Sequence, residues 1–151
     1  AAAKGHTAIV KLLLENDARI DDLDERGLTA LAWSVQEGYI EVTNLLIKKG
    51  AQVELRNSDG LTALHYAAIS KNIETLKRIL DTALAVNTAA ENGETALHWA
   101  ARGGKLEQVE LLLAAGAEPT RIGSGKTAAE LARKQGHSGV AIVIEMYDRA
   151  N

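Results

Sequence analysis

The sequence predicts an all-α fold, a solenoid of stacked helix-turn-helix units joined by β-hairpin-like loops. The first observation is a phrase that recurs at an interval of 33 residues, as GLTALAWSV at 27–35, GLTALHYAA at 60–68 and GETALHWAA at 93–101. The second is a glycine that follows the phrase, as at Gly38 and Gly104. The third is an apolar run after that glycine, such as LLI or LLL. A fixed period indicates a repeat architecture, in which each unit buries its apolar face against its neighbours.

The period defines one repeat domain over residues 1–151. A partial repeat spans 1–21, and four further repeats span 22–54, 55–87, 88–120 and 121–151. Ala1 and Ala2 align with Ala67 and Ala68, so the partial repeat contains only the end of its first helix. We therefore expect the chain to be a fragment of a longer array. An uncapped apolar end favours association, and we otherwise expect a monomer.

The first complete repeat illustrates the turn, cap and helices that we expect in each unit. Residues 24–27 predict a turn in which Gly27 adopts a positive φ, and Thr29 predicts a helix N-cap. The first helix should end near Gly38, and a second helix should run from about residue 40 to residue 49.

The second complete repeat is the least regular. Lys71 and Asn72 replace the glycine that follows the phrase, and Ala83-Leu84 replaces the small-residue stop Gly-Ala. We expect Asn72 to supply the left-handed conformation, since Asn tolerates it better than most residues. The irregularity has two interpretations, local sequence drift or a hinge in the binding surface, and the array should be softest here.

The repeats resemble the ankyrin repeat family over almost the whole chain. The family phrase T-P-L-H-x-A is matched at Thr62 and Thr95, with Ala in place of Pro in all four repeats. The resemblance implies a non-catalytic protein–protein interaction scaffold that binds a partner protein or peptide through a concave groove and the hairpin tips. The alternative is the targeting or autoregulatory ankyrin domain of a larger enzyme or channel.

Three aromatic residues are the first candidates for partner contacts. Trp33, Tyr66 and Trp99, followed by Leu131, occupy the same slot in successive first helices. Large amphipathic rings on a rigid surface are typical interface anchors. The other interpretation is that these rings are half buried and only fill space between helices.

The resemblance also implies solvent-facing contacts at the hairpin tips and at the ends of the first helices. These candidates are Glu25, Arg26, Ser58, Asp59, Glu91, Asn92, Ser124, Gln36, Glu37, Ile69, Ser70, Arg102 and Gly103. Their mixed charges suit a specific protein epitope better than nucleic acid or lipid.

Composition argues against several other functions. The chain has no cysteine and a formal net charge of −3, so it contains no thiol nucleophile and no general basic character for nucleic acid. No apolar run approaches the ~18 residues of a membrane span. We expect no enzyme activity, cofactor, metal or membrane insertion, and a cytoplasmic or nuclear location.

Three motifs need a separate interpretation. GSGKT at 123–127 is similar to the end of a phosphate-binding loop, but the required earlier glycine is Thr120, and Gly125 and Thr127 fall on the repeat's own turn and N-cap. His65 and His98 lie one repeat apart, too far to share a metal ion, and the resemblance implies that they link adjacent repeats by hydrogen bonds. Asn87 lies where the hairpins of some ankyrin family members are hydroxylated, so the resemblance also implies a third hypothesis, that Asn87 is modified.

Overall fold

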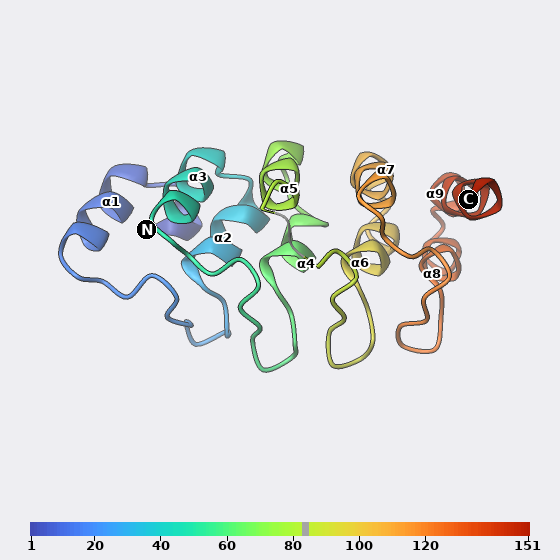
Figure 1. Cartoon of the computed structure of the whole chain (residues 1–151), viewed down its shortest axis with the longest axis horizontal. Coiled ribbons are helices and arrows are strands. Elements are labelled where there is room, and N and C mark those ends of the chain that lie inside the picture. Colours follow the sequence, from blue (N-terminus) through green and yellow to red (C-terminus); the bar gives the residue numbers. More distant parts are fainter. Residues whose placement is uncertain (83–84) are drawn as a thin grey trace. The chain divides into compact units, whose positions relative to one another are not determined.

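The computed structural model describes residues 1–82 and 85–151, and regular structure in this part of the chain is helical (Figure 1). The all-α expectation is confirmed. The only β-type pairing among the described residues is a single bridge between Gly123 and Lys126. The predicted irregularity at Ala83-Leu84 lies outside the described residues. The chain divides into two compact units, residues 1–84 and 85–151.

The first unit contains the partial repeat and the two repeats that follow it. Within a repeat, α2 packs against α3 and α4 against α5, and between the repeats α2 packs against α4 and α3 against α5. The first helices therefore form one layer and the second helices another. The elements are η1 (Ala2–Lys4), α1 (Thr7–Glu15), α2 (Ala30–Glu37), α3 (Ile40–Lys48), α4 (Ala63–Ala67) and α5 (Ile73–Leu80).

The second unit contains the last two repeats with the same two-layer arrangement. Here α6 packs against α7 and α8 against α9, while α6 contacts α8 and α7 contacts α9. The elements are α6 (Ala96–Arg102), α7 (Leu106–Ala114), α8 (Ala128–Lys134) and α9 (Ser138–Ala150).

The predicted N-cap at Thr29 is confirmed. Its hydroxyl oxygen accepts a hydrogen bond from the Ala32 amide at 3.1 Å. Thr62, Thr95 and Thr127 also precede first helices, and each forms a capping box with the residue three positions later. The cap satisfies amide groups that a short helix would otherwise leave unpaired at its first turn.

Alanine, leucine and isoleucine form the core of each unit. In the first unit Leu31, Leu46 and Leu76 are at most 1% exposed, and in the second unit Leu97 and Leu112 are fully buried. Most alanines on the first helices are also buried, and their small side chains let neighbouring helices approach closely.

Two buried hydroxyl pairs join the two layers of the first unit. Ser34 Oγ and Thr43 Oγ1 lie 3.0 Å apart between α2 and α3. Ser70 Oγ and Thr75 Oγ1 lie 2.7 Å apart beside α4 and α5, at different register positions from the first pair. Each pair satisfies polar groups in the core, which would be costly to bury alone.

The glycine after the phrase is required both for its backbone conformation and for close packing. Gly38 has φ +83°, and a Cβ at this position would lie 2.7 Å from the Cβ of Asn72 in the next repeat. A side chain here would therefore clash as well as strain the backbone.

The expectation for Asn72 itself is wrong. Its φ is −131°, in the extended region, and it acts as the N-cap of α5 by accepting a hydrogen bond from the Glu74 amide. Its side-chain amide donates to the Gly38 carbonyl oxygen at 3.2 Å. These two hydrogen bonds fix Asn72 as a link between repeats, so it takes no left-handed turn.

Candidate functional site

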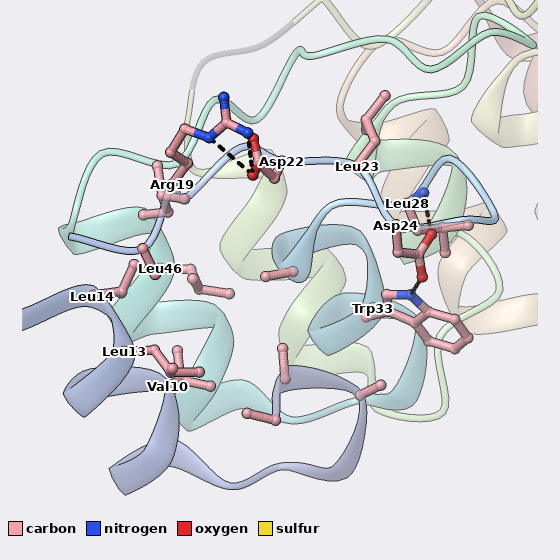
Figure 2. Close-up of a pocket in the computed structure, with 16 residues that line it drawn as sticks. Val10, Leu13, Leu14, Arg19, Asp22, Leu23, Asp24, Leu28, Trp33 and Leu46 are labelled. Carbon is pink, nitrogen blue, oxygen red and sulfur yellow. Dashed lines mark hydrogen bonds and ion pairs between the residues drawn. The ribbon is translucent and has the colours of Figure 1, made fainter. Parts of the chain in front are cut away.

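Trp33 is held in place by two different interactions. Its indole Nε1 donates a hydrogen bond of 2.6 Å to Asp24 Oδ2, as Figure 2 shows. The Arg26 guanidinium lies over the ring, 4.8 Å from its centroid, in cation–π geometry. The ring is half buried and packs against Leu28 and Ala32. Trp33 is therefore an ordered aromatic surface rather than a freely rotating side chain.

Asp24 connects this ring to the hairpin. Its Oδ1 accepts hydrogen bonds of 2.9 Å from the amides of Arg26 and Leu28, so one carboxylate closes the turn and orients the indole. These hydrogen bonds lower the pKa of Asp24, the bond from the Leu28 amide most strongly, against a weaker opposing effect of desolvation. The carboxylate is thus ionised at neutral pH.

Tyr66 is in the same slot but is buried, with 8% of its surface exposed. Its ring packs with Leu28 and Ala32 of the preceding repeat, and its hydroxyl oxygen accepts a hydrogen bond from Asn57 Nδ2 at 3.3 Å. Burial is the main cause that raises the pKa of this hydroxyl. Tyr66 mainly fills the core between two repeats.

A shared arrangement links the two aromatic residues of the first unit. Asp24 precedes Trp33 by nine residues, and Asn57 precedes Tyr66 by nine. Like Asp24, Asn57 accepts from two amides of its own hairpin, those of Asp59 and Leu61. Sequence reasoning missed this role for Asp24 and Asn57, although the spacing between an Asp or Asn and the aromatic slot was visible.

The other two residues at the repeat position of Trp33 and Tyr66 lie in the second unit. Trp99 is half buried, and Leu131 is buried with 5% exposed. Ala90 occupies the position in its repeat that Asp24 and Asn57 occupy in theirs. No carboxylate or amide side chain can therefore orient Trp99 from that position.

Most of the other predicted contact residues lie at the surface of their units. The hairpin-tip residues are exposed, Gly103 is exposed, and four of the helix-end residues are partly exposed. The exposed tip residues are Glu25, Arg26, Ser58, Asp59, Glu91, Asn92 and Ser124, and the partly exposed helix-end residues are Gln36, Glu37, Ile69 and Arg102.

Ser70 departs from this expectation, because it is only 1% exposed. Its hydroxyl donates a hydrogen bond of 2.6 Å to the Val35 carbonyl oxygen of the preceding repeat and contacts Thr75. A short side chain that finds these partners turns inward, so Ser70 does not face solvent.

Two of the helix-end residues are engaged in ion pairs. Lys71 Nζ lies 2.5 Å from Glu37 Oε2, and this hydrogen bond raises the pKa of Lys71. Arg102 pairs with Glu94, whose side chain is 1% exposed. Leu28 and Leu61 occupy the position of Glu94 in the earlier repeats, so the buried carboxylate is specific to this repeat and was not predicted.

His98 links two repeats, as the resemblance implied. The Thr95 amide donates to His98 Nδ1 at 3.2 Å, so Nδ1 is an acceptor and the proton lies on Nε2. Nε2 then donates to the Arg121 carbonyl oxygen of the next repeat at 2.9 Å. His65 makes the equivalent capping contact, in which the Thr62 amide donates to Nδ1 at 3.1 Å. Burial lowers the pKa of His98.

The GSGKT string forms the predicted hairpin turn and helix cap. Gly123 and Lys126 exchange two backbone hydrogen bonds, and both central residues have positive φ, +51° at Ser124 and +74° at Gly125. Thr127 then caps α8 together with Glu130. The interpretation of Gly125 and Thr127 as turn and N-cap residues is confirmed.

Asn87 also has a structural role. Its Oδ1 accepts from the Glu118 amide at 2.9 Å, and its Nδ2 donates to the Gly116 carbonyl oxygen at 3.1 Å. Asp21 makes the equivalent contact in the first unit, accepting from the Gln52 amide. Hydroxylation of Asn87 stays a hypothesis.

Within 1–82 and 85–151, no group of three or more His, Asp or Glu side chains is arranged to hold a metal ion. In the same residues, no helix combines the length and apolar character that crossing a membrane requires.

The comparison with protein families agrees with the repeat geometry. The family model for ankyrin repeats (3 copies) matches residues 1–57, 50–123 and 84–148. The chain therefore belongs to the ankyrin repeat family. Ankyrin repeats generally mediate protein–protein interactions and are typically non-catalytic. A comparison with curated proteins returned no match.

The first prediction concerns the double role of Asp24. Replacing Asp24 with Ala removes three hydrogen bonds and should lower the free energy of unfolding by about 1–2 kcal/mol. Asp24→Asn is the matched control, because its single oxygen can still close the turn while its amide group offers no acceptor to the indole. We expect Asp24→Asn to retain most of the stability but to shift the Trp33 indole N–H signal in NMR spectra. An unchanged indole signal in Asp24→Asn would contradict the orienting role.

The second prediction concerns pH. Because burial lowers the folded-state pKa of His98, its contribution to stability is complete above the unfolded value of about 6.5 and is lost as the pH falls through the folded value. The melting temperature should therefore decrease between pH 7 and pH 5. His98→Asn keeps an acceptor for the Thr95 amide but does not titrate, so its decrease should be smaller. Equal decreases in both proteins would show that His98 does not cause the effect.

Proposed function

We propose that the chain is a non-catalytic scaffold that binds a partner protein or peptide through what we call its first-helix surface. In the first unit this surface comprises Trp33, the exposed hairpin tips and the partly exposed ends of α2 and α4. In the second unit it comprises Trp99, the exposed hairpin tips and the partly exposed end of α6. The observation that carries the proposal is the fixed Trp33 ring beside exposed Glu25 and Arg26.

The physical argument is preorganisation. A tryptophan whose indole is already hydrogen-bonded and covered on one face by Arg26 loses little side-chain entropy when a partner binds. Tryptophan and arginine are also the residues that most often dominate interface energies. An ordered Trp–Arg pair next to a solvent-exposed hairpin suits the role of an anchor.

The charges on the surface favour a protein partner. Glu25 and Arg26 lie at one tip and Asp59 at the next, so both signs occur within one unit. Mixed charges support register and specificity in a protein interface, whereas binding to nucleic acid is dominated by positive charge. Tyr66 and Ser70 are left out of the proposed surface because both are buried.

The third prediction tests this surface with tryptophan variants. A partner is first identified by affinity capture from native cell extract and mass spectrometry, and its affinity is then measured for Trp33→Ala and Trp99→Ala. Truncation of a true anchor should cost at least about 2 kcal/mol, or roughly 30-fold in Kd. Leu106→Ala is the control, because Leu106 is 43% exposed but lies on the second-helix layer.

Melting temperatures of all three variants separate binding from folding. The proposal requires folded tryptophan variants that lose the partner and a Leu106→Ala variant that keeps it. If the folded tryptophan variants bind as tightly as the original chain, the partner uses another surface and the proposal is wrong.

A further inference from the structure

A buried carboxylate is paired with a partly exposed guanidinium in the second unit. The Glu94 side chain is 1% exposed and the Arg102 side chain is 40% exposed, and Arg102 Nη2 donates a hydrogen bond to Glu94 Oε1. Arg102 is the last residue of α6 and Glu94 precedes this helix, so the arginine side chain runs back toward the helix N-terminus. Trp99 lies three residues before Arg102, a spacing that makes two side chains neighbours on a helix. Trp99 and Arg102 therefore belong to one surface of the second unit.

The next repeat holds Glu94 in place. Gly123 packs directly on it, since a Cβ at Gly123 would lie 2.7 Å from Glu94 Cα and 2.9 Å from Glu94 Cγ. A carboxylate is costly to bury without a cation, which Arg102 supplies here. Glu94 therefore orders Arg102, as Asp24 orders Trp33 in the first unit.

Arg102 has more hydrogen-bonding capacity than its contact with Glu94 uses. A guanidinium carries five N–H donors in a planar fork, and this contact uses Nη2. The fork matches the two oxygens of a carboxylate, and such charge-assisted hydrogen bonds are about twice as strong as neutral ones. Arg102 is thus an ordered donor group that can bind a second carboxylate.

The sequence around the ends of α6 and α8 is basic. Residues 101–105 (ARGGK) and 133–137 (RKQGH) contain four Lys or Arg residues and no Asp or Glu. α6 packs against α8, and exposed Lys134 ends α8 as Arg102 ends α6 (Figure 1). In the first unit the corresponding region carries Glu37 and Lys71, which pair with each other. Positive charge at the first-helix ends is therefore a feature of the second unit.

We propose that Arg102 binds an Asp or Glu side chain of the partner, with Lys134 as a second, weaker positive contact and Glu94 as the residue that positions Arg102. The inference rests on the proposed function, because it names the partner group that the first-helix surface of the second unit recognises. Glu94 offsets part of the charge of Arg102, so recognition depends on the directed N–H groups more than on net charge. Lysine, a point charge without the fork, cannot replace Arg102 in this role.

Short displayed peptides of random sequence test this assignment. The library is selected on the original chain, and peptides whose binding weakens with Trp99→Ala are kept, because they contact the first-helix surface of the second unit. We expect one position of these peptides to be enriched in Asp or Glu. Changing that residue to the corresponding amide should weaken binding by at least about tenfold in Kd.

A double-mutant cycle connects the peptide acid to Arg102. Arg102→Lys keeps a cation beside Glu94, and Glu94→Gln/Arg102→Gln removes both charges, so neither variant leaves a buried carboxylate without its cation, and both keep the net charge. Each should weaken the acidic peptide by about tenfold or more, whereas the amide peptide should bind them as it binds the original chain.

Two further variants test the supporting residues. Glu94→Gln should lower the NMR order parameter at Arg102 Nε and weaken the acidic peptide but not the amide peptide. Lys134→Gln should weaken the acidic peptide roughly twofold. Its matched control is Lys48→Gln, which makes the same charge change on the second-helix layer of the first unit and should have no effect.

Melting temperatures establish that each variant is folded. The inference is overturned if the selected peptides carry no enriched acid, or if the change from acid to amide has the same effect on the original chain and on Arg102→Lys. Peptides that depend on Trp33 but not on Trp99 overturn it as well, and all three results leave the proposed function standing. If no enriched peptide depends on either tryptophan, the proposed function fails and this inference fails with it.

Discussion

The constraint on which the structure depends is the shortness of its helices. α4 has five residues and α2 has eight, and isolated helices below about 12–15 residues are marginal in water. Each helix is therefore stabilised by its partner in the repeat and by the neighbouring repeat, and the first helices α2, α4, α6 and α8 are stabilised by their threonine caps as well. Threonine at the start of each first helix and the buried leucines and alanines behind it meet this requirement in every complete repeat.

The same constraint determines how the candidate binding surface is built. Side chains at the position of Trp33 and Tyr66 can pack between repeats or remain partly exposed to solvent. The neighbouring side chains determine which of the two occurs in each repeat. Tyr66 packs on Leu28 and Ala32 of the preceding repeat and becomes core. Trp33 is only half buried, and Asp24 and Arg26 fix its orientation. A surface assembled from packing residues is ordered before any partner arrives, which lowers the entropic cost of binding.

Periodicity made the repeats, the caps and the aromatic slot predictable. The predicted side-chain exposure and backbone conformation are wrong at residues whose hydrogen-bond partners lie far away in the sequence. Ser70 turns inward because the Val35 carbonyl oxygen is within reach, and Asn72 caps α5 and bonds to Gly38 instead of adopting a positive φ. The nine-residue spacing between Asp24 and Trp33 is visible in the sequence. The hydrogen bond between them could not be predicted from that spacing, because it depends on the orientation of the indole ring.

Native-state hydrogen exchange tests the central claim, that the two helices of a repeat are stable only together. If so, the slowest amides of α2 and α3 should exchange with the same free energy of opening and the same dependence on denaturant. A lower opening free energy for α2, with α3 still protected, would show that the first-helix layer opens by itself. That result would contradict both the cooperative repeat and a preorganised binding surface.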